Sequence, residues 1–172
     1  PSAREIAPPL LALAEPLSCC LRARTRLPIT STSHVLILGT GPIGLIHCAL
    51  AAAAGASVMA CGRPARLDPA LALGASTVTA SQGDELVATV REWSGGAGAD
   101  VVIIAVGDPG LVPIAAQCTA IGGYISCFAG FPAGTLAQID PNLIHYRELT
   151  ISGSANATLE DYAAAVATLS TG

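Results

Sequence analysis

The chain has 172 residues, which suits one domain with a single hydrophobic core. Hydrophobic residues make up 52% of it, enough apolar surface to drive folding, so intrinsic disorder is excluded. Charged residues make up only 12%, the net charge is −4, and the basic residues are scattered arginines. Because no basic stripe is present to neutralise a phosphate backbone, we expect no nucleic-acid partner.

The most apolar stretch, residues 35–61, is interrupted by glycine, proline and histidine. A membrane helix needs about 20 uninterrupted apolar residues, so we interpret this stretch as a buried strand and a buried helix, and expect no membrane partner. The six cysteines contain no C-x-x-C pair, and no histidine has a neighbour at metal-ligand spacing. We therefore expect reduced thiols, a cytoplasmic location and no zinc site built from a local motif.

Apolar periodicity divides the chain into a short lead-in and an alternating domain. Residues 1–30 are expected to form the lead-in, with leucines at helical spacing and a helix that begins at Pro16. Beyond it, strands are predicted at 35–38, 58–61, 77–79, 101–106, 123–128 and 149–152. Helices are predicted at 42–54, 65–73, 84–93, 110–118 and 158–169, with an irregular stretch at 131–142. Single helices between strands imply right-handed crossovers, so residues 31–172 are predicted to form a doubly wound, six-stranded parallel α/β sheet with helices on both faces.

A glycine motif, G-x-G-x-x-G, follows the first predicted strand and opens the next helix. It consists of Gly39, Gly41 and Gly44, with Pro42 and Ile43 between the last two. In such a unit the first glycine allows a tight turn, the second lets a pyrophosphate approach the backbone, and the third lets the helix pack on the strand. The motif in this context predicts a Rossmann fold that binds a dinucleotide.

The end of the second predicted strand bears on which dinucleotide is bound. NAD-binding sites usually place a carboxylate there to hold the ribose 2′-hydroxyl. This chain has Cys61, Gly62 and Arg63 at that point, with Arg66 close behind, and no carboxylate before Asp68. A small residue beside arginines leaves room and charge for a 2′-phosphate, so NADP is expected in preference to NAD. The alternative is that Arg63 is an ordinary solvated loop residue with no part in cofactor binding.

Several segments together resemble the medium-chain, zinc-dependent alcohol and polyol dehydrogenases of the sorbitol and threonine type. These are EPL at 15–17, GTGPIG at 39–44, LALGA at 71–75, GADVV at 98–102, HYREL at 145–149 and ISGS at 151–154. Their order and spacing are similar to those of the family's cofactor domain over most of the chain.

The resemblance implies an enzyme of about twice this length, with a GroES-like catalytic domain that this chain does not contain. That domain would supply the ligands of catalytic zinc, so this chain by itself contains no catalytic residue. Glu15 is implied to lie beside the zinc, as a ligand or near one. The alternative is that Glu15 only stabilises the start of a helix by its interaction with the helix dipole, by about 0.3–1 kcal/mol.

The resemblance also places three strand ends around the nicotinamide. They are Val106 and Gly107 after the fourth strand, Gly130 and Phe131 after the fifth, and Ser152 and Gly153 in the sixth. It further implies a homodimer or homotetramer in which the sixth strand pairs with its symmetry mate.

The favoured function is the NADP-binding part of a zinc-dependent dehydrogenase that moves a hydride between a small alcohol or polyol and the cofactor. The isolated chain should bind dinucleotide without turnover. Two alternatives remain open: a zinc-free quinone or enoyl reductase of the same superfamily, and a non-catalytic domain that senses NAD(P).

Overall fold

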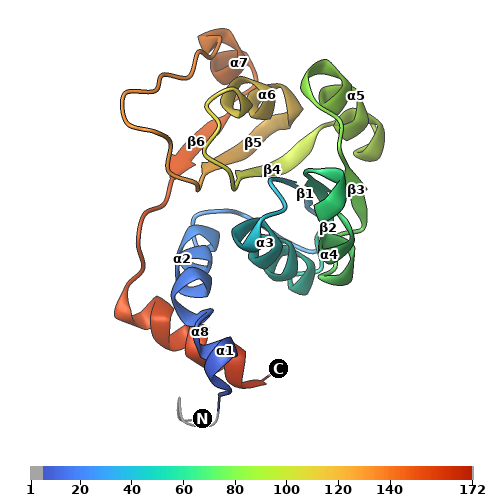
Figure 1. Cartoon of the computed structure of the whole chain (residues 1–172). Coiled ribbons are helices and arrows are strands. Elements are labelled where there is room, and N and C mark those ends of the chain that lie inside the picture. The colour runs from blue at the N-terminus through green and yellow to red at the C-terminus, as the bar shows by residue number, and fades with distance from the viewer. Residues whose placement is uncertain (1–5, 172) are drawn as a thin grey trace.

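A computed structural model describes residues 6–171 of the chain, so residues 1–5 of the predicted lead-in and residue 172 lie outside the described part. Six parallel strands form one sheet in the order β3-β2-β1-β4-β5-β6 (Figure 1). Their bounds are His34–Leu38 (β1), Ser57–Cys61 (β2), Thr77–Thr79 (β3), Ala99–Ile104 (β4), Thr119–Cys127 (β5) and Thr150–Gly153 (β6). Because β1 pairs with both β2 and β4, the strand order reverses beside β1. The predicted doubly wound parallel sheet is confirmed.

Helices connect the strands and cover both faces of the sheet (Figure 1). The helices after β1 are α3 (Pro42–Ala53), the 3₁₀ helix η2 (Pro64–Arg66), α4 (Asp68–Ala72), α5 (Gly83–Trp93), α6 (Leu111–Cys118), α7 (Pro141–Tyr146) and α8 (Leu159–Thr171). Ahead of β1 lie α1 (Pro8–Leu11) and α2 (Ala14–Arg24). No helix within residues 6–171 is long and apolar enough to cross a membrane.

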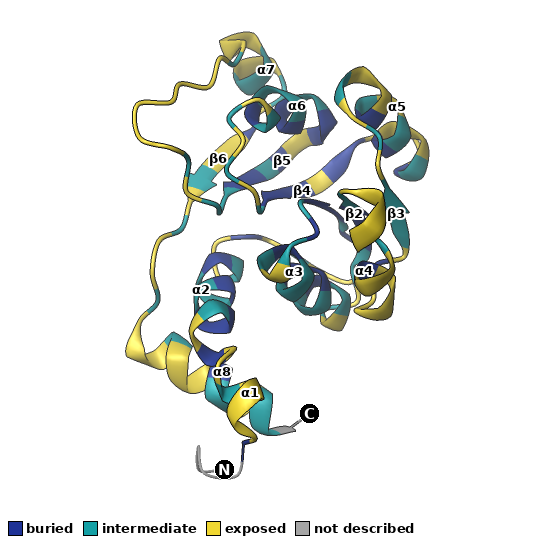
Figure 2. Ribbon diagram, in the orientation of Figure 1, coloured by how far each residue is buried: buried dark blue, intermediate teal, exposed yellow. Residues whose placement is uncertain are grey.

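The alternation of side chains along the strands builds two cores. In β1, Leu36 and Leu38 point to the face covered by α5, α6 and α7, whereas Val35 and Ile37 point to the face covered by α3 and α4. The central strands β1, β2 and β4 are therefore largely buried, and Figure 2 colours most of their residues dark blue, whereas β3 and β6 at the two edges are less buried. Full burial of such a side chain contributes about 1.5–3 kcal/mol, which explains why near-continuous apolar runs marked these strands in the sequence.

The lead-in helix α2 joins the last helix to the sheet. It packs against α3 and against α8, and α8 reaches it through an extended segment after β6 (Figure 1). An ion pair of 3.5 Å between Arg22 and Asp161 links α2 to α8, and Arg26 donates a hydrogen bond of 2.7 Å to the carbonyl oxygen of Gly153. The ion pair thus holds α2 and α8 together, and the hydrogen bond ties the segment after α2 to the carboxyl end of β6.

Two of the predicted helices begin at other residues in the structure, and proline explains both differences. Helix α2 begins at Ala14 rather than Pro16, because the third position of a helix needs no N–H donor and tolerates proline. The single helix predicted at 65–73 is two short helices, η2 and α4. Pro64 and Pro69 each stand in the first turn of one of them, so each marks a new start.

Three other boundaries also differ from the prediction. Strand β4 ends at Ile104, two residues before Val106, whose side chain is exposed. Strand β5 begins at Thr119, directly after α6. Its register with β4 shifts between Ala99 and Val101 of β4. The stretch predicted as irregular runs into α7, which Asp140 caps by accepting a hydrogen bond of 2.9 Å from the backbone of Asn142. An Asp followed by Pro is a helix-start signal that the sequence carried.

Candidate cofactor site

The glycine motif forms the loop between β1 and α3. Gly39 has a φ of +113°, which favours glycine, and its N–H donates a hydrogen bond of 2.8 Å to the carbonyl of Cys61. A Cβ added to Gly44 would overlap the carbonyl oxygen of Gly39 and lie 2.9 Å from its carbon, so the helix can approach the loop only through glycine. A Cβ added to Gly41 would meet nothing within 4 Å. Gly41 therefore leaves an open cradle that the protein's own atoms do not fill.

The cradle lies at the N-terminus of α3. Gly41 is the N-cap and offers no side chain to the first turn, and Pro42 occupies the first helical position. The backbone N–H groups of that turn have no partner within the helix, and the helix dipole is positive there. Such a terminus binds the pyrophosphate of a dinucleotide, and the open space at Gly41 fits it.

A cavity of about 650 Å³, which we call the first cavity, opens on one side of the glycine loop. It is lined by the loop itself, by the end of β2, by residues 80–83 after β3, and after β4 by residues 105, 106, 108, 110 and 111. It therefore lies at the carboxyl ends of the strands, where the strand order reverses, and this is the usual place for a ligand in such sheets.

The charges of the first cavity are mainly positive. Gly62 lies at the end of β2 and adds no side chain, while Arg63 and Arg66 are exposed and line the cavity. Neither arginine forms an ion pair within residues 6–171. The carboxylate of Asp108 is the acid among the lining residues, and it accepts a hydrogen bond of 2.9 Å from the backbone of Gly110. The arginines are thus free to meet an anion.

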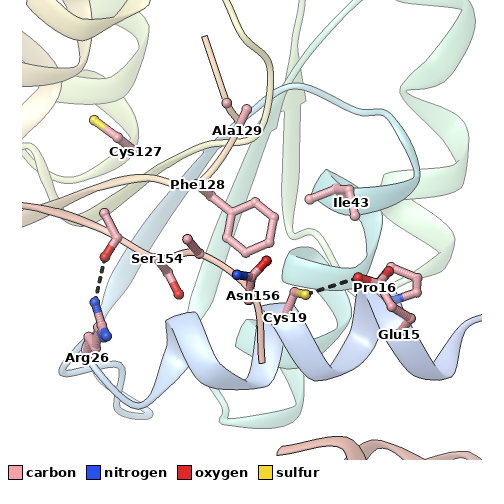
Figure 3. Close-up of a pocket in the computed structure, with 13 residues that line it drawn as sticks. Glu15, Pro16, Cys19, Arg26, Ile43, Cys127, Phe128, Ala129, Ser154 and Asn156 are labelled. Atoms are coloured by element: carbon pink, nitrogen blue, oxygen red, sulfur yellow. Dashed lines mark hydrogen bonds between the residues drawn. The ribbon is translucent and has the colours of Figure 1, made fainter. Parts of the chain in front are cut away.

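A cavity of about 740 Å³, the second cavity, opens on the other side of the loop (Figure 3). Four distant segments build it: α2 with Arg26 beyond it, the start of α3 at Ile43, residues 127–130 after β5, and residues 153–156 after β6. Glu15 is exposed and faces this cavity from α2, where its Oε1 accepts a hydrogen bond of 3.4 Å from the Cys19 thiol. Burial, and then the carboxylate of Glu15, raise the pKa of Cys19, so this thiol stays protonated and donates.

The wall of the second cavity rests on a buried histidine. His47 lies in α3 with 2% of its surface exposed, and its ring meets that of Phe128 edge to face, with centroids 4.6 Å apart. Its Nε2 atom has no hydrogen-bond partner within the described residues. Burial lowers the pKa of His47 to about 4, so the ring is neutral at physiological pH.

The structure divides the predicted site residues into two groups. Those that line a cavity are Gly39, Gly41, Gly62, Arg63, Arg66 and Val106 in the first, and Glu15, Ile43, Gly130 and Gly153 in the second. The others are held near the cavities by the backbone: Pro42 and Gly44 in α3, Gly107 packed against the carbonyl of Gly130, Phe131 against the core, and Ser152 within β6.

Sequence reasoning missed lining residues in both cavities. Thr40 lines the first cavity from within the glycine motif, and Ser81 and Gln82 line it from the loop after β3. The position of that loop at a carboxyl strand end was a usable signal. Phe128 and Asn156 line the second cavity, but no local pattern marks them. Within residues 6–171, no group of three or more His, Cys, Asp or Glu side chains could hold a metal ion.

Comparison with known proteins agrees with this geometry. A family model described as zinc-binding dehydrogenase matches residues 42–171. The chain is 34% identical over 159 residues to L-galactonate-5-dehydrogenase from Escherichia coli strain K12, covering 92% of this chain and 46% of that protein. It is 34% identical over 144 residues to (R,R)-butanediol dehydrogenase from Bacillus subtilis strain 168, covering 83% of this chain and 41% of that protein.

The fold is also similar to solved structures. One is a zinc-binding dehydrogenase from Sinorhizobium meliloti 1021 bound to NADP, with a TM-score of 0.85 and 31% identity over 93% of this chain and 48% of that one. The chain thus spans about half the length of the proteins that it matches. Because the family match covers most of the chain and agrees with the glycine loop and sheet order, the chain belongs to the zinc-binding dehydrogenase family.

Proposed function

We propose that this chain is the NADP-binding part of a zinc-dependent alcohol or polyol dehydrogenase. The observation that carries the proposal is the open cradle at Gly41, which lies at a helix N-terminus between two cavities. A dinucleotide laid across this terminus would place its adenosine half in the first cavity and its nicotinamide half in the second. The named relatives act on alcohols, and one similar structure holds NADP.

In this proposal the chain binds and orients the cofactor, and the bound groups supply the reactivity. When bound, NADP would supply the hydride acceptor and zinc a Lewis acid that lowers the pKa of the alcohol. The first turn of α3 binds the pyrophosphate through its free N–H groups. Ile43 and Phe128 line the second cavity with apolar surface and limit the access of water to a nicotinamide there.

Preference for NADP over NAD rests on the rim of the first cavity. Arg63 and Arg66 offer positive charge, and neither Cys61 nor Gly62 carries a carboxylate that would repel a 2′-phosphate. Hydrogen bonds to charged groups contribute about 1.5–3 kcal/mol each, so loss of one arginine should weaken NADPH binding roughly tenfold to a hundredfold.

Titration of the chain with NADPH and NADH, followed by nicotinamide fluorescence or calorimetry, tests the proposal. We expect tighter binding of NADPH, and loss of that preference in Arg63→Ala. Arg91→Ala is the matched control, because Arg91 is exposed on α5 and lines neither cavity, yet the change in net charge is the same. Failure to bind either dinucleotide, or equal loss in the control, would contradict the proposal.

Glu15 gives the chain a part in metal chemistry. Its carboxylate faces the second cavity and forms no ion pair within the described residues, so it fits a position beside a zinc ion held mainly by another part of the protein. The chain alone should therefore not turn over alcohols. Zinc content of the whole protein should fall in Glu15→Ala and remain in Glu85→Ala, which changes an exposed acid on α5.

Assembly is proposed to involve strand β6. Within residues 6–171 it is an edge strand whose partner is β5, and Thr150 and Ile151 are exposed on it. Pairing with a second β6 across a two-fold axis would give a homodimer or a unit of a homotetramer. Light scattering of Ile151→Lys should report a smaller particle than that of the unchanged chain.

A cytoplasmic location belongs to the same proposal and agrees with the free thiols.

A further inference from the structure

Thr40 presents an unpaired hydroxyl group to the first cavity. It is the second residue of the glycine motif and lines that cavity, although only 5% of its surface is exposed. Its Oγ1 atom forms no hydrogen bond within residues 6–171. Because buried polar groups in folded proteins are almost always hydrogen-bonded, a bound ligand is the natural partner for this hydroxyl.

The hydroxyl oxygen of Thr40 can be reached from the cavity. Among the described residues, the wholly buried side-chain polar atoms without a partner are Nε2 of His47 and Oγ of Ser154. Oγ1 of Thr40 also lacks a partner but is not one of these atoms, so it retains some exposed surface. Since Thr40 lines the first cavity, a ligand there can form a hydrogen bond with this oxygen.

Two neighbours of Thr40 indicate which part of a dinucleotide would meet it. Gly41 follows Thr40 in the chain and forms the open cradle for the pyrophosphate. Gly62 follows β2, and a Cβ added to it would overlap Oγ1 of Thr40, so the hydroxyl lies over the end of β2. Folds of this kind hold the 2′ position of the ribose at the end of that strand. The adenosine ribose joins the pyrophosphate to the 2′ position, so Thr40 lies beside this sugar.

Backbone hydrogen bonds fix the position of Thr40. The N–H of Gly39, next to Thr40, donates to the carbonyl of Cys61 at 2.8 Å, and the N–H of Gly62 donates to the carbonyl of Thr79 at 3.0 Å. Thr40 is also β-branched, which restricts its χ1 angle. The hydroxyl is therefore held in place before a ligand arrives, and binding loses little side-chain entropy.

We propose that the hydroxyl of Thr40 binds the 3′-hydroxyl of the adenosine ribose. In NADP the 2′ oxygen carries the phosphate, so the 3′-hydroxyl is the ribose hydroxyl that remains free. A threonine hydroxyl can donate one hydrogen bond and accept two, so it can pair with another hydroxyl in either direction. The bond is common to NADP and NAD, so it adds affinity for both and does not distinguish them. This inference rests on the proposed function, because it requires that a dinucleotide binds in the first cavity.

Removal of the hydroxyl without a change of shape tests the inference. Thr40→Val keeps the branched side chain, and its Kd for ADP, measured by calorimetry, should be about threefold to tenfold higher than that of the unchanged chain. Thr40→Ser keeps a hydroxyl and should bind ADP within about twofold of the unchanged chain. The Tm of Thr40→Val should not fall, because the hydroxyl has no partner within the described residues.

A second probe, 3′-deoxy-ADP, identifies the group on the ligand. It should bind the unchanged chain more weakly than ADP does, and in Thr40→Val this difference should shrink by about threefold to tenfold, because both changes remove the same bond. Thr77→Val is the matched control, since Thr77 stands in β3 and lines neither cavity. Its Kd values for both probes should equal those of the unchanged chain.

Two results would overturn the inference: a Thr40→Val chain that binds ADP as tightly as the unchanged chain, or a difference between ADP and 3′-deoxy-ADP that is equally large in both chains. In either case ADP still binds. Failure of the proposed function would look different and would overturn both proposals, because the unchanged chain would then bind neither ADP nor NADPH.

Discussion

The two cavities beside the glycine loop are built in different ways. The first lies at the ends of four successive strands, around a loop that a single strand and helix define, and its arginines carry unpaired positive charge. The second is assembled from segments as far apart as Glu15 and Asn156, and its charged residues already bond to neighbours: Glu15 to Cys19, and Arg26 to Gly153. The first should therefore depend on local backbone geometry, and the second on how α2 and α8 dock.

The largest expected effect concerns Gly44, which lets α3 pack closely on the glycine loop. Gly44→Ala should destabilise the chain by about 3 kcal/mol, because the new Cβ overlaps the carbonyl of Gly39 and the backbone on both sides is fixed. For a domain of this size we expect the Tm to fall by roughly 6–12 °C, measured by calorimetry. A variant with the Tm of the unchanged chain would show that the loop can yield.

Acid should weaken the wall of the second cavity. His47 has a folded pKa of about 4 and an ordinary value of 6.5, so the unfolded chain binds more protons between these values. The stabilisation is complete above pH 6.5 and is lost as the pH falls toward 4, by about 2 kcal/mol at pH 5.

Urea unfolding at pH 7 and pH 5 measures this loss, and His47→Leu should flatten the dependence in that window. The other histidines, His34 and His145, remain in the variant as an internal control. An unchanged pH dependence would mean that His47 does not cause it.

The next effect separates binding from stability in the first turn of α3. Gly41→Ala should leave the free energy of unfolding within about 0.5 kcal/mol, since its φ of −77° suits alanine and its Cβ meets no protein atom. The same methyl group would occupy the place of the pyrophosphate, so the Kd for NADPH should rise about tenfold or more. Paired with Gly44→Ala, it distinguishes a glycine needed by the ligand from one needed by the fold.

The smallest effect concerns the contact between α2 and β6. Arg26→Ala removes one hydrogen bond to the carbonyl of Gly153, which contributes about 0.5–1.5 kcal/mol. Binding of adenosine 2′,5′-bisphosphate, which reaches only the first cavity, should not change. Weaker binding of this probe in the variant would show that the two cavities are coupled.

Much of the sheet was predictable because its central strands β1, β2 and β4 are buried on both faces. Val101, Val102 and Ile103 stand in one apolar run, and a buried parallel strand requires such a run. Helix starts near proline were harder to place. Pro16 permits a start at any of several preceding residues, and packing of Ala14 selects the actual one.

The sequence by itself determined the Rossmann fold, the glycine loop and the arginines near β2, because each is marked by residues close together in the chain. Only the tertiary structure decided the second cavity and the contact between Thr40 and Gly62, where a Cβ added to Gly62 would overlap the Oγ1 of Thr40. Those features depend on distances between segments that sequence patterns do not encode. Phe128 became part of the second cavity, and Thr40 came to restrict Gly62, only when the strands had packed side by side.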